Sequence, residues 1–257
     1  MCRLIGIVGT HPLPVRDVLD AFFPLGTEGH VKCTMTPGHQ DGWGLSGYSM
    51  KRAVYFGRRA EPVTGDKNQF ESATEKAAKS QSPLVIGHLR KASAGERDVA
   101  NSHPFHSHDW IFAHNGTVFG ATASLPLTDG DPQGDTDSER LFFWILEQIR
   151  NEDDRTEALV DLLKKARPAL VYSALNFLMT DGKQLWAYRD FGDKRFDSGE
   201  TLEEREKYYT LYYARVERSA VICSEPLKSV STSWQPMAPR TLAVFSPEML
   251  APRTITI

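Results

Sequence analysis

The chain has 257 residues, with 30 basic and 33 acidic side chains and a formal net charge of -3, and one layered domain is expected over residues 2–257 because this length can bury one large core. It has no basic block that would follow a phosphate backbone, so nucleic acid is not expected as a partner. No apolar stretch approaches the length of a membrane span and the N-terminus has no signal-peptide pattern, so we expect a cytoplasmic protein without a membrane partner.

The first half of the chain alternates short apolar segments with turn-forming residues. A strand is predicted at residues 3–9, and helical spacing predicts a helix within residues 14–26, ended by proline and glycine. The polar segment 94–108 is predicted to be a loop. Between this helix and this loop, strands are predicted at residues 43–49, 53–59 and 82–93, and a further strand is predicted after the loop at residues 109–116.

The second half begins with helices and returns to strands. Residues 134–152 open with a capping box, Thr136 with Glu139 three residues on, and a second helix is predicted at residues 155–166, ending before Pro168. The charged segment 197–209 is predicted to be a solvated loop or a short helix. Strands are predicted at residues 173–180, 184–190, 209–216, 219–227 and 241–247. Hairpins on both sides of a helical pair predict an α+β fold of two antiparallel sheets covered by helices.

The first candidate for chemistry is Cys2, directly after the initiator methionine. An N-terminal cysteine carries a thiol and a free α-amino group in one residue, and an amine that titrates at about pH 8 can serve as the general base. This requires removal of Met1. Cys2 also fits a small buried residue at the start of a strand. Cys33 and Cys223 form no CxxC pair with it or with each other, so neither a disulfide framework nor a zinc thiolate site is predicted.

Three further motifs place polar groups at the ends of predicted elements. In GHLRKAS, Arg90 ends a strand, where a guanidinium can bind a carboxylate through two hydrogen bonds or simply lie on the surface. In AHNG, the Asn115 amide and the backbone N–H of Gly116 can point at one oxygen as an oxyanion hole, although a plain Asn-Gly turn has the same sequence. In GDTDSE, Asp137 starts a helix, which it can cap, or it can bind a substrate ammonium group.

Taken in order, the segments MCRLIGIVG, HQDGWG, GHLRKAS, NSHPF, AHNG and GDTDSE resemble the class II glutamine amidotransferases, which are N-terminal-nucleophile (Ntn) amidohydrolases. The resemblance covers about the first 140 residues. It implies a four-layer α/β/β/α sandwich and a single glutamine amidotransferase type-2 domain over residues 2–257. It also implies site residues, namely Cys2 as the nucleophile, Asn115 and Gly116 as the oxyanion hole, Arg90 and Asp137 as ligands of the α-carboxylate and α-amino groups, and His103 lining the pocket.

The resemblance has a finer level and some departures. HQDGWG, NFLMTDGKQLWAYRD and SEPL look like the small stand-alone branch, which includes the γ-glutamyl amidohydrolase of ergothioneine biosynthesis. Lys91 stands where larger family members have tryptophan, and Ser93 and Ala94 stand where they have threonine and histidine, so the carboxylate end of the pocket differs. No synthase domain follows residue 140, so no ammonia acceptor is expected within the chain.

The reaction that the resemblance implies is hydrolysis of the side-chain amide of glutamine or a γ-glutamyl compound through a thioester on Cys2, without a metal or organic cofactor. One alternative is an ammonia-supplying glutaminase subunit of a separate synthase, which would be its partner. A second is a metal-dependent hydrolase, because clustered imidazoles can bind zinc, here His103, His106, His108 and His114. A third, a non-catalytic regulatory subunit, is disfavoured by the retention of Cys2 together with AHNG.

Overall fold

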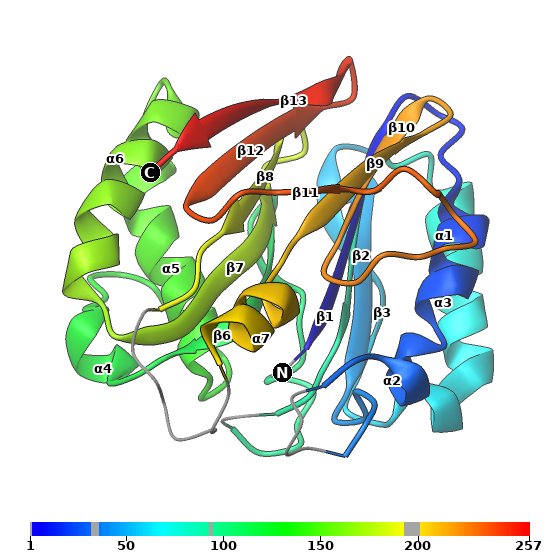
Figure 1. The fold of residues 1–257 in the computed structure, drawn as a ribbon, viewed down its shortest axis with the longest axis horizontal. Helices are drawn as coiled ribbons and strands as arrows, with labels where there is room; N and C mark the ends of the chain where they lie inside the picture. Colours follow the sequence, from blue (N-terminus) through cyan, green and yellow to red (C-terminus); the bar gives the residue numbers. More distant parts are fainter. Residues whose placement is uncertain (1, 32–35, 93–94, 193–200) are drawn as a thin grey trace.

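The protein, described here by a computed structural model, consists of two facing antiparallel sheets with helices on both outer faces (Figure 1). The described residues are 2–31, 36–92, 95–192 and 201–257. Cys33, Ser93, Ala94 and the first part of the charged segment, residues 197–200, lie outside these ranges. The predicted α+β fold and its four-layer order of helix, sheet, sheet and helix are confirmed.

The first sheet has the strand order β11-β9-β10-β1-β4-β2-β3. Its central strand β1 is buried along its whole length, because sheet and helices cover both faces. Ile5 of β1 pairs with Gly87 on one side and with Cys223 on the other. The N-terminal end of β1 therefore emerges between the ends of β4 and β10. The strands are β1 Arg3–Gly9, β2 Trp43–Ser49, β3 Arg52–Arg59, β4 Leu84–Leu89, β9 Tyr212–Val216, β10 Ser219–Cys223 and β11 Gln235–Pro236.

The second sheet has the order β13-β12-β8-β7-β6-β5. Its longest pairing joins β6 to β7, with Asn115 directly opposite Asn176 and an irregularity between Gly116 and Val118. This irregularity lies at the same end of the molecule as the start of β1 (Figure 1). The strands are β5 Phe105–Ser107, β6 Trp110–Val118, β7 Tyr172–Thr180, β8 Leu185–Arg189, β12 Thr241–Ser246 and β13 Met249–Thr256.

Helices cover the two outer faces of the sheets, and one short helix closes the end near the N-terminus (Figure 1). On the first sheet lie α1 Val15–Phe22, α2 Leu25–Glu28 and, after the 3-10 turn Val63–Asp66, α3 Lys67–Lys79. On the second lie α4 Ala121–Ser124, α5 Asp137–Ile149 and α6 Arg155–Ala169. The short helix is α7 Leu202–Tyr208. Within the described ranges, no helix is long and apolar enough to cross a bilayer.

The core has three layers, as the alternation of side chains along each strand requires. Between the sheets lie residues such as Leu4, Ile86, Ile111 and Leu178. Ile5, the next residue along β1, faces the opposite side and packs in the layer under α1 and α3. A third apolar layer joins the second sheet to α5 and α6. Because alternate residues go to opposite faces, Cys2 belongs to the side of β1 that faces the second sheet.

Several predicted boundaries are wrong for identifiable reasons. The expected loop 94–108 contains β5, whose Phe105 pairs with Phe112 of β6, so tertiary pairing outweighs its polar composition. The helix expected to stop before Pro168 continues to Ala169, because a proline in the last turn removes few backbone bonds and Leu170 N still donates to Ala166 O.

Other segments differ in kind from their predictions. The strand expected at residues 82–93 ends at Leu89, and in the segment predicted as strand 209–216 the strand begins only at Tyr212. Helix α3 was not expected, because its buried face consists of Phe70 with small residues, Ala73, Thr74 and Ala77, which give a weak apolar signal. Of the two alternatives for residues 197–209, the described part is helical, with a full capping box between Thr201 and Glu204.

Candidate active site

Cys2 is fixed at the start of β1 by the side chain of Asn115 on β6. The Cys2 nitrogen donates to Asn115 Oδ1 at 3.2 Å, and Asn115 Nδ2 donates to the Cys2 carbonyl at 3.0 Å. The Asn115 Nδ2 group carries two N–H bonds, so one is used here and a second can serve another acceptor. The Cys2 nitrogen held in this way is the atom that becomes the α-amino group once Met1 is removed.

The Cys2 thiol lies against the backbone of Lys91, which follows β4. Lys91 N donates to Cys2 Sγ at 3.3 Å, and the thiol donates to Lys91 O at 3.5 Å. Burial raises the pKa of the Cys2 thiol above its ordinary value, although the Lys91 amide opposes this effect. A buried thiol with a raised pKa needs a nearby base to become a nucleophile.

Asp41 of the HQDGWG segment holds the backbone that contacts the thiol. Asp41 N donates to Arg90 O at 2.9 Å, and Asp41 Oδ2 accepts from Ala92 N at 2.9 Å. Burial acts to raise the pKa of Asp41, but the hydrogen bonds from Arg97 and Ala92 outweigh it and hold this pKa below its ordinary value. No role is assigned to Asp41 from the sequence, and its position in HQDGWG is the only signal in the sequence that points to it.

The two glycines of HQDGWG allow close approach of neighbouring backbone. Gly42 has φ +135°, which favours glycine, and a Cβ on Gly44 would lie 2.3 Å from His103 O. The segment 101–105, with sequence NSHPF, can therefore lie directly on β2. Arg58 of β3 holds the same segment by donating to the carbonyls of Ala100 and Ser102.

Arg90 is almost fully buried beside Cys2. Its Nη1 donates to Glu96 O at 3.1 Å and, more weakly, to Asp41 O at 3.4 Å, and its Nη2 donates to Gly95 O at 3.2 Å. The predicted binding of a substrate carboxylate by Arg90 would exchange one of these backbone acceptors for the carboxylate. That role stays a prediction.

Asp137 is the first residue of α5, but it does not cap the helix. Thr136 is the N-cap and accepts from Glu139 N at 3.2 Å, whereas Asp137 Oδ2 accepts from Val118 N at 2.6 Å. The predicted capping box is only half formed, because the Glu139 side chain accepts from Gly134 N at 2.7 Å instead of from Thr136. Asp137 thus joins the start of α5 to the end of β6.

Gly116 lies where β7 approaches most closely. A Cβ at this position would lie 2.0 Å from Ala174 O and 2.8 Å from His114 Nε2. No other residue fits here without moving β7. The Asn-Gly pair lies within strand β6 and does not form a hairpin turn. The register irregularity of the β6–β7 pair lies directly after Gly116.

His103 and His114 border the pocket as neutral rings. Burial lowers the pKa of His103 well below the ordinary histidine value, and burial also lowers the pKa of His114. Because Ala174 O can only accept, His114 Nε2 carries the proton that it donates to this carbonyl at 3.2 Å, and His114 Nδ1 accepts from the Ser138 hydroxyl at 2.9 Å. The His103 ring lies 4.2 Å from that of His88, and burial lowers the pKa of His88 too.

The four clustered histidines do not converge on a common point. His106 stacks on Tyr55 with ring centroids 3.6 Å apart and contacts Ser46 Oγ at 2.9 Å, away from His114. In the part of the chain that the structure describes, no group of three or more His, Cys, Asp or Glu side chains is arranged to hold a metal ion. The metal-dependent alternative therefore has no supporting geometry among these residues.

One pocket is lined by all of the site residues predicted from the sequence except Asn115. Asn115 lies behind Cys2, as its two hydrogen bonds show. The pocket is small, with a volume of about 20 Å³, which is room for about one water molecule. Its lining comprises Cys2, Arg90, His103, Gly116 and Asp137 together with Lys91, Ala92, His114, Thr136 and Ser138.

Comparison with known proteins identifies the family. The family model of the class II glutamine amidotransferases matches residues 1–252, and the chain belongs to this family. It is 31% identical over 203 residues to an uncharacterised protein of Methanocaldococcus jannaschii, covering 76% of this chain and 52% of that protein. It is 29% identical over 200 residues to the provisionally named glutamine amidotransferase YafJ of Escherichia coli, covering 73% and 72% respectively. The chain thus spans about half of the archaeal relative.

Solved structures agree on the fold. A protein from Silicibacter pomeroyi described as a glutamine aminotransferase class-II domain protein superposes with a TM-score of 0.63 at 22% identity, over 100% of both chains. The glutamine phosphoribosylpyrophosphate amidotransferase of Bacillus subtilis superposes with a TM-score of 0.66 at 16% identity, over 99% of this chain and 49% of that one. The Ntn-type sandwich implied by the sequence is confirmed, while the resemblance to the ergothioneine enzyme stays a prediction.

Proposed function

We propose that this protein hydrolyses the side-chain amide of glutamine or of a γ-glutamyl compound, with Cys2 as the nucleophile. The observation that carries the proposal is the double hydrogen bond between Asn115 and Cys2, at 3.2 and 3.0 Å. It supports the proposal because the Cys2 nitrogen, the prospective α-amine, and the Asn115 amide donor both lie at the residue that carries the thiol. An N-terminal nucleophile with an oxyanion donor needs those three groups together.

In the proposed first step, the free α-amine of Cys2 takes the thiol proton as Sγ attacks the amide carbon. The carbonyl oxygen becomes an oxyanion, which the second N–H of Asn115 and the N–H of Gly116 stabilise. The C–N bond then breaks, and the leaving nitrogen takes a proton from the α-ammonium group. The glutamyl group remains on Cys2 as a thioester until water attacks it and releases glutamate.

The same pocket supplies groups for the glutamyl end of the substrate. Asp137 offers a carboxylate to the α-ammonium group, and Arg90 offers its guanidinium to the α-carboxylate. Both line the pocket beside Cys2. His103 and His114 add neutral, buried rings to the wall, because burial lowers the pKa of each.

The test is an assay of Met1-free enzyme with glutamine and a panel of γ-glutamyl amides. Cys2→Ala should abolish turnover, whereas Cys223→Ala should retain most of it, because Cys223 is buried in β10 and burial raises the pKa of its thiol. A diazo-oxo-norleucine label should be found on Cys2. Turnover that survives Cys2→Ala and is lost with EDTA would replace this proposal by a metal-dependent reaction. Turnover that stays at background until a synthase is added would favour the ammonia-supplying subunit.

A further inference from the structure

Arg3 directly follows the proposed nucleophile and is a buried cation, with only 1% of the residue exposed. Its Nη1 donates to Cys2 O at 3.4 Å, and its Nη2 donates to His30 O. Successive side chains of a strand point to opposite faces, so Arg3 lies on the face of β1 away from the thiol. The cation therefore contacts the backbone of Cys2 without lining the pocket beside Sγ.

Glu225, from the SEPL segment after β10, forms an ion pair with this cation. Its Oε2 lies 2.7 Å from Arg3 Nε and also accepts from His30 N at 2.9 Å. Within the pair, Arg3 Nε faces the carboxylate and Arg3 Nη1 faces Cys2 O. The positive member of the pair is therefore the one that contacts Cys2.

The ring of Tyr208, the last residue of α7, lies over the guanidinium of Arg3. The centroid of the ring is 5.0 Å from Arg3 Cζ, a separation at which a cation is attracted to an aromatic face. Burial raises the pKa of Tyr208, so its hydroxyl is neutral at any pH at which an α-amine titrates. Tyr208 thus helps to hold Arg3 in place without adding a charge.

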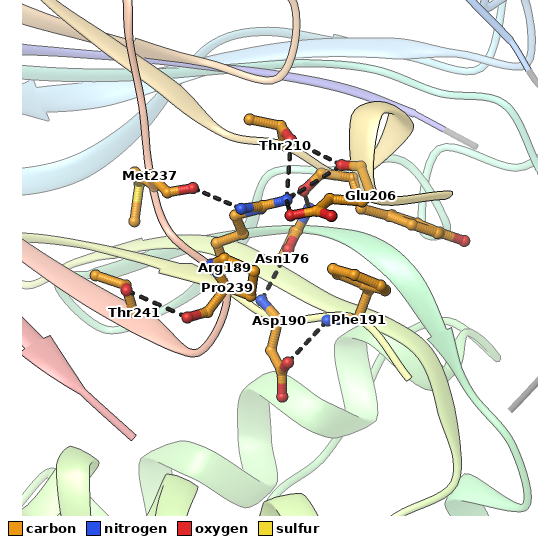
Figure 2. Close-up of polar contacts among 10 residues, drawn as sticks. Asn176, Arg189, Asp190, Phe191, Glu206, Thr210, Met237, Pro239 and Thr241 are labelled. Atoms are coloured by element: carbon orange, nitrogen blue, oxygen red, sulfur yellow. Dashed lines mark hydrogen bonds and ion pairs between the residues drawn. The ribbon is translucent and has the colours of Figure 1, made fainter. Parts of the chain in front are cut away.

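The end of α7 that carries Tyr208 is itself fixed from β8. Arg189 donates to Glu206 O at 3.1 Å and to Thr210 Oγ1 at 2.9 Å, as Figure 2 shows. Arg189 Nε also donates to Tyr209 O at 3.2 Å. These bonds satisfy backbone carbonyls at the end of the helix, where a cation is favourable. The contact between Tyr208 and Arg3 therefore rests on a buried network.

The charge of Arg3 acts on the group that would be the catalytic base. After removal of Met1, the Cys2 nitrogen is an amine on the carbon next to the carbonyl that Arg3 contacts. A nearby positive charge disfavours the protonated form of an amine, and a nearby carboxylate favours it. Because the guanidinium is the nearer member of the pair, the pair as a whole favours the neutral amine, which is the form that accepts the thiol proton.

Other titratable groups surround Cys2, and all of them are unchanged when only the pair is altered. Burial acts to raise the pKa of Asp41, but its hydrogen bonds hold that pKa below its ordinary value, so Asp41 is charged. Burial lowers the pKa of His39 to about 3, so its ring is neutral above pH 5. The remaining groups around Cys2 and the pair are Arg90, Lys91, His30, His103, His114, Asp137 and Lys207.

We propose that Arg3 is a positioning residue for the catalytic base: the buried Arg3–Glu225 pair holds Cys2 by its carbonyl and keeps its α-amine in the neutral form near neutral pH. The proposal rests on the proposed function, in which this amine takes the thiol proton. The pair itself makes and breaks no bond in the reaction.

The first experiment measures kcat/KM of Met1-free enzyme for glutamine from pH 5 to pH 9, because the acid limb of this profile reports the base of the free enzyme. Arg3→Met leaves Glu225 unmatched and should move the limb to higher pH by about half a unit or more. Glu225→Gln leaves Arg3 unmatched and should move it to lower pH. The double variant should lie close to the wild type, and Arg3→Lys, which keeps the charge, should lie closer to it than Arg3→Met.

Two controls accompany these variants. Asp181→Asn removes the carboxylate that pairs with Arg155 at 2.6 Å, beyond the end of β7 that is remote from Asn115, and it should not move the limb. The series is repeated with His30→Gln, which removes the imidazole beside the pair. Shifts that persist without this imidazole belong to the pair.

The second experiment observes the amine without turnover. In Met1-free Cys2→Ala protein, the rate at which acetic anhydride acetylates the N-terminal amine is measured against pH by peptide mass spectrometry. The pH at which half of the amine is protonated should move up with Arg3→Met and down with Glu225→Gln. Glu225→Gln is nearly isosteric, so this arm remains decisive if Arg3→Met does not fold.

The outcomes separate the two proposals. If the amine titrates at the same pH in all variants, or if both single variants shift it in the same direction, the role of the pair is overturned and the proposed function stands. If the amine shifts as expected but the wild type hydrolyses neither glutamine nor any γ-glutamyl amide, the proposed function fails. Opposite shifts of both the amine and the acid limb support the assignment of Arg3.

Discussion

Asn115 and Asn176 lie directly opposite each other in the β6–β7 ladder, and each side chain binds a segment outside that ladder. Asn115 binds the backbone of Cys2. Asn176 Nδ2 donates to Tyr209 O at 2.7 Å, and its Oδ1 accepts from Asp190 N at 3.1 Å. One cross-strand pair therefore connects the position of Cys2 to the residue that follows α7.

Asn115→Asp should lower kcat for glutamine about a hundredfold, with a much smaller change in KM. The aspartate keeps an acceptor for the Cys2 nitrogen but loses the Nδ2 donors, which act on charge that develops only in the transition state. Steady-state kinetics check this. A raised KM with unchanged kcat would show that Asn115 binds the ground state instead.

Asp137→Ala should raise KM for glutamine by roughly thirtyfold, which corresponds to about 2 kcal/mol for a lost charge-assisted hydrogen bond. The control is Asp154→Ala, which removes the N-cap of α6, whose side chain accepts from Glu157 N at 3.0 Å. That variant should lower Tm without raising KM. If Asp137→Ala lowers Tm but leaves KM unchanged, as expected for the control, the role of Asp137 is limited to its contact with Val118.

Asp41→Asn should lower kcat/KM by about tenfold. It removes the charge that accepts from Arg97 and weakens the hydrogen bond that fixes Ala92, next to the Lys91 backbone on which the thiol lies. The comparison variant is Asp66→Asn, since Asp66 accepts from Trp43 and Arg59 at the same end of β2 and β3 but makes neither of the bonds that Asp41 makes to Ala92 and Arg97. The two variants are compared by kinetics and by Tm. Equal effects on kcat/KM would contradict a specific role for Asp41.

Acid should destabilise the protein below about pH 6.5, the ordinary histidine pKa of an unfolded chain. Burial lowers the pKa of His106 to about 3 and lowers those of His88, His103 and His114 as well. Between these values the unfolded chain binds protons that the folded one does not, so stability falls as pH falls, by at most about 1.4 kcal/mol per pH unit for each histidine.

Thermal unfolding measured from pH 7.5 to pH 5 checks this prediction. Tm should fall over that range. The His106→Gln variant should show a smaller decrease in Tm between pH 7.5 and pH 5 than the wild type, because it lacks one histidine that the unfolded chain protonates. This comparison does not depend on the Tm of the variant at pH 7.5. A Tm that does not change down to pH 5 would mean that the histidines are protonated in the folded state.

Local sequence signals identified much of the fold, because most strands are apolar runs bounded by turn residues and β1 is buried along its length. They failed where stability comes from distant partners. Strand β5 is polar and depends on pairing with β6, and α3 is held by alanines that pack under the first sheet. Glu139 matched a capping box in sequence, but a nearby backbone amide, Gly134 N, competes successfully for its carboxylate.

The site residues were inferred from motif order and not from any one motif. Taken alone, Asn115 and Gly116 are more typical of a plain turn, and the close approach of Ala174 explains the glycine. Asn176 and Arg189 could not be found in this way, because their partners on α7 and beyond are set by tertiary packing. Residues whose role is to position a segment carry no local signature of that role.

The central claim is that Cys2 acts through its own free α-amine, and the most direct measurement is intact mass against specific activity. Preparations with different fractions of Met1-free protein should show activity proportional to that fraction, because a peptide nitrogen at Cys2 cannot accept the thiol proton. A methionine aminopeptidase treatment should raise both together. Full activity in a preparation in which every molecule retains Met1 would contradict the account.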